Sequence, residues 1–328
     1  MHSSLKSNPR QKLRHWLRAL WKFSRPHTII GTSLSVVGLA LVALSTFYRG
    51  TDLFVIAPAG SSTGWFYGHF FWLILAALVP SLCANVYIVG LNQLTDIAID
   101  RINKPQLPLA SGEFSRKQGV WIIRCTGLLA VGLAVLQSYF LLLTVGLSLL
   151  IGTIYSIPPI RLKRFPFWAA LCIFGVRGIV VNIGFFLHFR QQLGGTGAIP
   201  LKLWVLTGFV ILFAFAIAIF KDIPDQDGDR QFQIRTLTVR LGSQAVFNLA
   251  VWVLTACYLG VVGIVIVGLP AVHTEFLGVT HLGLCFFLWY RSLQVEITNH
   301  RQVTHFYQWI WKLFFLEYLL FPVACLWS

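Results

Sequence analysis

Acidic side chains are scarce in this sequence. Only 11 of the 328 residues are Asp or Glu, against 26 Lys or Arg, and charged residues make up 11% of the chain. Soluble domains carry about 25% charged residues, whereas 56% of this chain is hydrophobic. A fold this apolar cannot cover itself with polar surface in water. The composition therefore excludes an ordinary soluble domain and predicts an integral membrane protein.

Cysteine pairs with metal-ligand spacing are also lacking. Each of the six cysteines lies inside an apolar run, and none forms a C-x-x-C pair. We interpret them as small buried hydrophobic residues. The net charge of +15 is typical of nucleic-acid-binding proteins, but the basic residues are scattered between apolar runs and do not gather in one soluble domain. We therefore expect no nucleic-acid partner.

Nine apolar runs are long enough to cross a bilayer, which takes about 20 residues of helix. They cover residues 28–47, 69–91, 119–136, 138–156, 167–189, 203–220, 245–268, 274–291 and 306–326. These runs predict an all-α, multi-pass membrane bundle of about nine transmembrane helices. We expect residues 1–26 to form a basic cytoplasmic arm and residues 27–328 to form a single transmembrane domain.

Lys and Arg are distributed unequally between the two sides of this bundle. The N-terminal arm and the loops after the second, fourth, sixth and eighth spans hold most of them, whereas the other connections hold only Arg49, Arg190 and Lys202. Basic residues favour cytoplasmic loops. We therefore expect the N-terminus in the cytoplasm and the C-terminus on the opposite side. The first apolar run is longer than a signal-peptide core, so we expect no cleaved signal.

The few acidic residues are concentrated in two of the cytoplasmic loops. Six of the eleven lie there: Asp96, Asp100, Asp222, Asp225, Asp227 and Asp229. Asn92, Asp96 and Asp100 follow at four-residue spacing, and Asp222, Asp225 and Asp229 at spacings of three and four. Each set lies on one face if its segment is helical, and Asp227 points away from that face. The two loops look like copies of each other, and a site at the interface of an internal repeat is a recurrent plan in membrane proteins.

Clustered carboxylates at the mouth of a membrane bundle repel one another and are poorly solvated. A divalent cation relieves both problems, and Mg²⁺ prefers carboxylate and amide oxygens together with phosphate oxygens. The basic neighbours Arg101, Lys104, Lys221 and Arg230 are then suited to bind a diphosphate. The alternative is that the acids are solvated loop residues balancing nearby cations. For an isolated D-x-x-x-D that alternative is the better interpretation, but two clusters in an acid-poor membrane chain favour a metal site.

These motifs resemble those of a known family. The patterns N-x-x-x-D-x-x-x-D and D-x-x-D-x-x-x-D, in two loops of a nine-span bundle, resemble the UbiA-type intramembrane prenyltransferases over nearly the whole chain. The longer strings are similar to the homogentisate prenyltransferases of tocopherol and plastoquinone synthesis, most of all the phytyl-transferring branch. They are FSRPHTIIGT, GLNQLTDIAIDRINKPQLPLASGEFS, YSIPPIRLKR and FKDIPDQDGDR. The short N-terminus is typical of a cyanobacterial-type protein of the thylakoid or plasma membrane.

The resemblance implies a Mg²⁺-dependent enzyme that transfers a phytyl group from phytyl diphosphate to homogentisate. Homogentisate would be prenylated on its ring and lose its carboxylate, giving 2-methyl-6-phytyl-1,4-benzoquinol, with the isoprenoid chain lying against the lipid bilayer. By motif position, the metal ligands would be Asn92, Asp96, Asp100, Asp222, Asp225 and Asp229. Of these, Asp96, Asp100, Asp225 and Asp229 would be the catalytic residues.

Many members of the family carry an Arg-rich segment after the first motif. Here NKPQLPLASG follows it, so Lys104 must stand in for those arginines. Arg161 and Lys163, in the loop after the fourth span, are further candidates for diphosphate binding, although topology alone would also place basic residues there.

Four more polar residues are candidates for binding the acceptor. Arg25 and His27 open the first span, where they could equally be interfacial anchors, and Tyr155 ends the fourth span. Arg177 lies inside the fifth span, and an Arg within a span is usually functional or paired internally.

Three alternatives remain open at this point. The same chemistry could use another acceptor, such as chlorophyllide, a flavonoid-like phenol or 4-hydroxybenzoate, or another donor, such as solanesyl diphosphate. From a different class, a transporter or channel with acidic cation sites also explains paired acidic motifs in a repeat. A transporter predicts carboxylates at mid-membrane, whereas these lie at the ends of spans beside basic residues.

Overall fold

The computed structural model describes residues 9–47, 63–231 and 236–328, and every regular element within these ranges is a helix. The long helices are α2 (Pro26–Leu44), α3 (Thr63–Thr95), α6 (Arg116–Val135), α7 (Tyr139–Ser156), α10 (Leu201–Phe220), α13 (Ser243–Val267), α14 (Thr274–Ser292) and α15 (His300–Leu326). A further span is composite, because α8 (Pro166–Phe174) continues through the π-helical turn η2 (Gly175–Val180) into α9 (Val181–Gln192).

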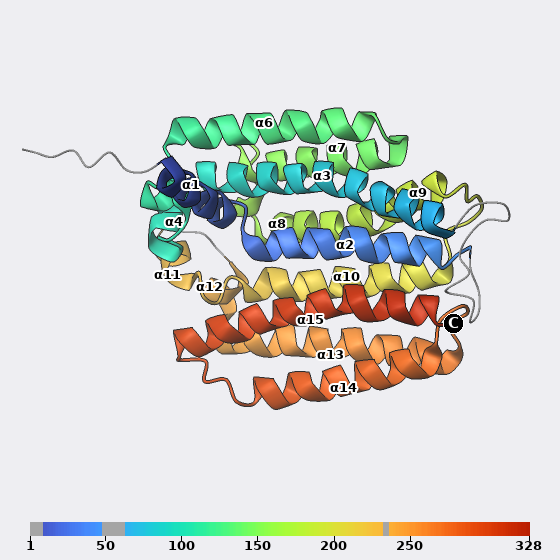
Figure 1. The fold of residues 1–328 in the computed structure, drawn as a ribbon. Helices are drawn as coiled ribbons and strands as arrows, with labels where there is room; N and C mark the ends of the chain where they lie inside the picture. Colours follow the sequence, from blue (N-terminus) through green and yellow to red (C-terminus); the bar gives the residue numbers. More distant parts are fainter. Residues whose placement is uncertain (1–8, 48–62, 232–235) are drawn as a thin grey trace, which may run out of the picture.

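The short helices are α1 (Pro9–Phe23), α4 (Ile97–Asn103), α5 (Pro108–Ser111), η1 (Leu162–Arg164), α11 (Gln226–Gln231) and α12 (Leu237–Leu241). Figure 1 shows α1, α4, α11 and α12 together at one end of the bundle, and the C-terminus at the other. Helix α4 packs against α11, so the two acid-bearing loops meet there.

All nine expected spans are helical in the structure. Among the described residues, eight helical segments are long and apolar enough to cross a membrane, and α14 is not one of them. Helix α14 nevertheless runs beside α13 and α15 in Figure 1. Its polar residue His281 is buried and faces Glu317 of α15, with Nε2 3.2 Å from Oε2. Because α1 and the C-terminus lie at opposite ends of the bundle, the chain path fits an odd number of crossings.

Local sequence signals fix where several helices begin. The Ser115 hydroxyl accepts a hydrogen bond from the backbone N–H of Gln118, whose side chain completes a capping box at the start of α6. Ser138 caps α7 in the same way through the N–H of Leu141. Proline occupies the first position of α2 and of α8. A backbone N–H at this position would have no acceptor within the helix, so proline loses no hydrogen bond there.

The buried core runs along the bundle axis, and aromatic rings make up much of it. Phe186, Phe213, Phe314 and Phe321 are fully buried, while large apolar side chains such as Trp72 remain exposed on the outside. An exposed apolar surface of this kind suits a lipid solvent. The two acidic loops lie at the bundle end that holds α4 and α11.

Candidate active site

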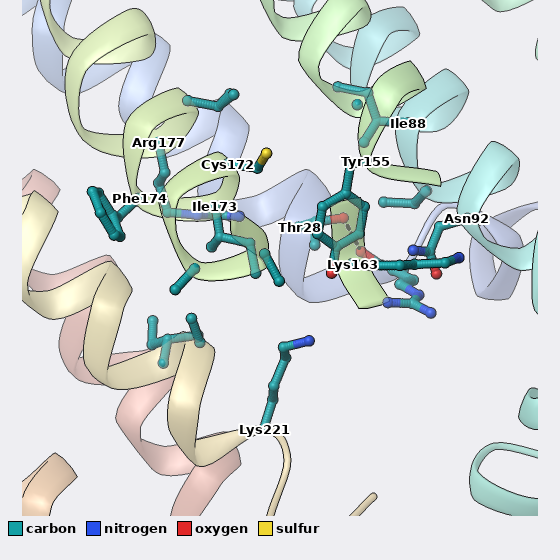
Figure 2. A pocket seen from close by; sticks show the side chains of 18 of the residues that line it. Thr28, Ile88, Asn92, Tyr155, Lys163, Cys172, Ile173, Phe174, Arg177 and Lys221 are labelled. Carbon is teal, nitrogen blue, oxygen red and sulfur yellow. Dashed lines mark hydrogen bonds between the residues drawn. The ribbon is translucent and has the colours of Figure 1, made fainter. Parts of the chain in front are cut away.

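A cavity of about 1960 Å³ is lined by residues of both acidic loops. Helices α2, α3, α4, α7, α8, α10 and α15 contribute to its wall, and Figure 2 shows part of it. Ligand pockets usually enclose about 300–1,000 Å³. This cavity therefore has room for a long-chain substrate and a second molecule beside it.

The first acidic motif lines the cavity, but on a broken helix. Helix α3 ends at Thr95, Asp96 has φ −117° and ψ 16°, and α4 begins at Ile97. The expectation that Asn92, Asp96 and Asp100 share one face of a continuous helix is therefore wrong. All three side chains still reach the same cavity because the break at Asp96 turns α4 across the bundle end.

Asp96 is held by two basic residues from the loop after α7. Its Oδ1 accepts a hydrogen bond from Arg161 Nη2 at 2.8 Å, and its Oδ2 accepts one from Lys163 Nζ at 2.6 Å. Lys163 also donates to the Thr95 hydroxyl at 2.9 Å. Burial lowers the pKa of Lys163, against the opposing effect of Asp96. Arg161 and Lys163, which were predicted to bind diphosphate, thus contact the first acidic motif.

The second acidic motif follows α10. Lys221 ends that helix, Asp222 and Asp225 lie in the turn after it, and α11 begins only at Gln226. The segment is therefore not helical at Asp222 and Asp225, and the expectation that these acids share one helical face is wrong. Both acids line the cavity nonetheless. The side chains of Asp227 and Asp229 lie outside the part of the chain that the structure describes.

Lys104 connects the two motifs. It follows α4, and its Nζ forms an ion pair with Asp225, 121 residues further along the chain. Lys221 lies beside Asp222, with Nζ 3.5 Å from Oδ1. Burial raises the pKa of Asp222, although Lys221 opposes this effect. The two loops are therefore joined by alternating positive and negative groups.

Asp100 differs from the other acids because no cation contacts its carboxylate within the described residues. It is 5% exposed, and its Oδ2 is buried without a hydrogen-bond partner. Burial raises its pKa to about 6, although Arg25 and Lys104 act in the opposite direction. An unsatisfied buried carboxylate oxygen on a residue that lines a cavity is a suitable ligand for a cation.

Two of the expected diphosphate ligands do not reach the cavity. Arg101 and Arg230 are exposed and point elsewhere, although each directly follows an aspartate in the sequence. Arg25, His27, Tyr155 and Arg177, the four candidates for acceptor binding, all line the cavity. Tyr155 lies close to Lys163 and Asn92 in Figure 2, whereas Arg177 lies on a different side of the pocket.

The structure adds residues that the sequence did not single out. Arg240 of α12 lines the cavity, as do Tyr307 and Trp311 of α15. Asn85 of α3 donates a hydrogen bond to the hydroxyl of Thr28 at 3.1 Å in the same wall. The basic composition of the loop after the sixth span was a signal for Arg240. No local pattern distinguishes Trp311 from the many lipid-facing and core aromatic residues.

The described residues contain no ready-made group of three His, Cys, Asp or Glu side chains placed to hold a metal ion. Asp96, Asp222 and Asp225 instead form ion pairs with Arg161, Lys163, Lys104 and Lys221. Mg²⁺ usually takes only one or two carboxylates and completes its shell with water and phosphate oxygens. The unpartnered oxygen of Asp100 and the amide of Asn92 fit a metal that arrives together with a diphosphate.

Comparisons with known proteins agree with this geometry. Residues 43–316 match the family model described as the UbiA prenyltransferase family. A homogentisate phytyltransferase of Synechocystis sp. is 50% identical over 311 residues, covering 94% of this chain and 96% of that protein. A homogentisate geranylgeranyltransferase of Triticum aestivum is 39% identical, covering 95% and 74% respectively.

A solved structure shares the fold. It is that of a UbiA homologue from Archaeoglobus fulgidus bound to GPP and Mg²⁺, with a TM-score of 0.60 and 17% identity over 93% of this chain and 99% of that chain. The match of the family model to most of the chain and the 50% identity over its length lead to one conclusion. This chain belongs to the UbiA prenyltransferase family.

Proposed function

We propose that this protein transfers a phytyl group from phytyl diphosphate to homogentisate, with Mg²⁺, and that the product is 2-methyl-6-phytyl-1,4-benzoquinol. The observation that carries the proposal is the juxtaposition of two acidic motifs and four basic side chains on one cavity at the bundle end. The names of the Synechocystis and wheat relatives support homogentisate as the acceptor. Because these names differ in the donor, the choice of phytyl rests on the higher identity to the Synechocystis protein.

The metal would be held by Asn92, Asp96, Asp100, Asp222 and Asp225, with Asp229 as a further ligand from the second motif. When bound there, Mg²⁺ supplies positive charge that stabilises the diphosphate as it leaves. The phosphate oxygens would be bound by four cations, Lys104, Arg161, Lys163 and Lys221. Each of them already contacts an aspartate of the proposed metal site. Arg101 and Arg230 are left out of this site.

The proposed reaction balances without an external oxidant or reductant. The allylic C–O bond breaks, and its electron pair leaves with the diphosphate. A π-electron pair of the ring forms the new C–C bond to the prenyl carbon, and that ring position loses its proton. The side-chain carboxylate leaves as CO₂, and the methylene carbon gains one proton to become the methyl group. A cavity shielded from water protects the allylic cation from hydrolysis.

Arg25, His27, Tyr155 and Arg177 are the candidates for contacts with the acceptor, because all four line the cavity without belonging to either acidic motif. The site would open on the cytoplasmic side of a thylakoid or plasma membrane, with the C-terminus on the other side. The apolar part of the cavity, with Phe167, Phe174 and Leu212 in its wall, would take the isoprenoid chain.

The test is product formation by membranes that contain the protein. Radiolabelled phytyl, geranylgeranyl and solanesyl diphosphates are supplied with homogentisate or 4-hydroxybenzoate, with and without Mg²⁺. We expect a lipid-soluble product from phytyl diphosphate and homogentisate that requires Mg²⁺ and disappears in Asp96→Ala and in Asp225→Ala. An Arg101→Ala variant, changed outside the cavity, serves as the matched control. Efficient product from a different donor or acceptor would overturn the substrate assignment.

A further inference from the structure

A basic residue lies on a distorted part of the fifth span, away from the acidic motifs. Arg177 is the third residue of the π-helical turn η2, between α8 and α9. Such turns inside α-helices are rare and occur frequently at functional sites. Arg177 lines the cavity, and Figure 2 shows it on a different side of the pocket from Asn92 and Lys163.

The guanidinium group of Arg177 lies between α2 and α15. Its Cζ is 4.9 Å from the centre of the Trp311 ring and 5.4 Å from that of Phe314. On the α2 side, its Nη1 would be 3.4 Å from a Cβ atom at Gly31, so the absence of a side chain there leaves room for the group. Gly31 is one helical turn, about 6 Å, further into the bundle than His27.

The local packing holds this arrangement in place. A Cβ atom at Gly178 would be 2.3 Å from Cγ1 and 3.2 Å from the Cα of Ile211 in α10, so only glycine permits this approach of the two helices. Side chains on a helix tilt toward its N-terminus. The N-terminus of α8 lies at the end of the bundle that carries the acidic loops. Arg177 is thus directed from within the span back toward the proposed reaction centre.

In the part of the chain that the structure describes, the charge of Arg177 is not balanced by a carboxylate, unlike the charges of the four cations that contact the acidic motifs. Lys104, Arg161, Lys163 and Lys221 each have a carboxylate partner, whereas within the described residues no carboxylate lies within 4.0 Å of Arg177. Its aromatic neighbours Trp311 and Phe314 attract the cation through their ring faces. This attraction only partly offsets the cost of removing an ion from water. A cation held this way inside a span is suited to an anionic ligand.

We propose that Arg177 binds the carboxylate of the aromatic acceptor, which makes this part of the cavity a subsite for an arylacetate. This inference rests on the proposed function, in which homogentisate supplies that carboxylate. A guanidinium matches a carboxylate with two parallel N–H donors, and the Trp311 ring, which Arg177 contacts, helps to hold the guanidinium in place. The cations of the acidic motifs are left for the diphosphate. The acceptor ring then lies between Arg177 and the leaving group, where the new C–C bond forms.

The test separates acceptor binding from donor binding. Wild type, Arg177→Gln and Arg177→Lys are compared in steady-state assays with phytyl diphosphate and either homogentisate or its uncharged amide, 2,5-dihydroxyphenylacetamide. Arg190→Gln is the matched control, because Arg190 belongs to the same composite span but binds the carbonyl oxygens of Gly197 and Ala198 at its far end. Size exclusion and circular dichroism establish that each variant is folded.

We expect Arg177→Gln to raise the KM for homogentisate about 10- to 100-fold, as for loss of a charge-assisted hydrogen bond, and to leave the KM for phytyl diphosphate within twofold. The variant should also lose the wild-type preference for the acid over the amide, and Arg177→Lys should keep part of it. An unchanged preference, or an increase in the donor KM instead, would overturn the assignment. If Arg177→Gln does not fold, Arg177→Lys provides the test. An unchanged preference of this variant for the acid over the amide would then overturn the assignment. A wild type that does not prenylate homogentisate would instead refute the proposed function.

Discussion

Lys104 offers the sharpest test of how the two acidic motifs cooperate. Its ammonium group is the link between them, since it follows α4 and pairs with Asp225 beside α11. If this cation moves to the diphosphate when the donor binds, Lys104→Gln should weaken donor binding and leave the acceptor unaffected. A hydrogen bond to a charged group contributes about 1.5–3 kcal/mol. The kcat/KM for phytyl diphosphate should therefore fall about 10- to 150-fold.

The stability of the fold should change little in this variant. The Lys104 and Asp225 side chains are 32% and 18% exposed, and ion pairs with this much solvent contribute at most about 1 kcal/mol. The assay measures steady-state prenyl transfer at saturating homogentisate while the concentration of phytyl diphosphate is varied. Thermal unfolding of the same variant is measured in detergent. A loss of activity that merely follows a loss of stability would contradict the proposed role.

Arg101→Gln is the matched control for this prediction. Arg101 lies three residues before Lys104 and carries the same charge, but its side chain is exposed and does not reach the cavity. We expect its kcat/KM for phytyl diphosphate to stay within twofold of wild type. Equal effects of the two substitutions would show that only the net charge of the loop matters, and would refute the geometric argument.

Other parts of the structure give further predictions. Glu317→Leu should lower the free energy of unfolding by about 3–5 kcal/mol, because His281 loses its buried partner, and adding His281→Leu should restore most of it in detergent unfolding curves. Gly178→Ala should cost about 1–3 kcal/mol through overpacking against Ile211 and also raise the KM for homogentisate. Single cysteines at positions 117 and 328, in a cysteine-free background, should react with an impermeant thiol reagent from opposite sides of the membrane.

Much of the fold was predictable because hydropathy and capping are local properties. Each of the nine apolar runs became a helix, and in the structure Ser115 and Ser138 cap the helices that two of these runs form. Helix α14 shows why hydropathy alone is not sufficient. Its His281 lowers the hydropathy of the segment, but the side chain is buried against Glu317 of a different helix, and that partner cannot be read from local sequence.

The composition of the site was partly predictable, and its geometry was not. Spacing placed Asp96 and Asp100 on one helical face, but the helix breaks at Asp96, where two basic residues from a distant loop bind the carboxylate. Adjacency in the sequence favoured Arg101, yet its neighbour Asp100 points inward while Arg101 points out. The π-helical turn around Arg177 has no local signature, because it depends on the close approach of α10.

The separation of charges along the cavity fits the proposed chemistry. At the bundle end, Asp96, Asp222 and Asp225 contact cations, so a diphosphate that arrived with a metal could exchange partners with both sets of charges. The cations would then hold phosphate oxygens and the carboxylates would hold the metal, so that no buried charge would be left alone. Deeper in the span, Arg177 has aromatic neighbours in place of a carboxylate, and in the proposed function the carboxylate of the acceptor supplies the missing negative charge. The proposal therefore places the two reacting carbon atoms between Arg177 and the acidic motifs.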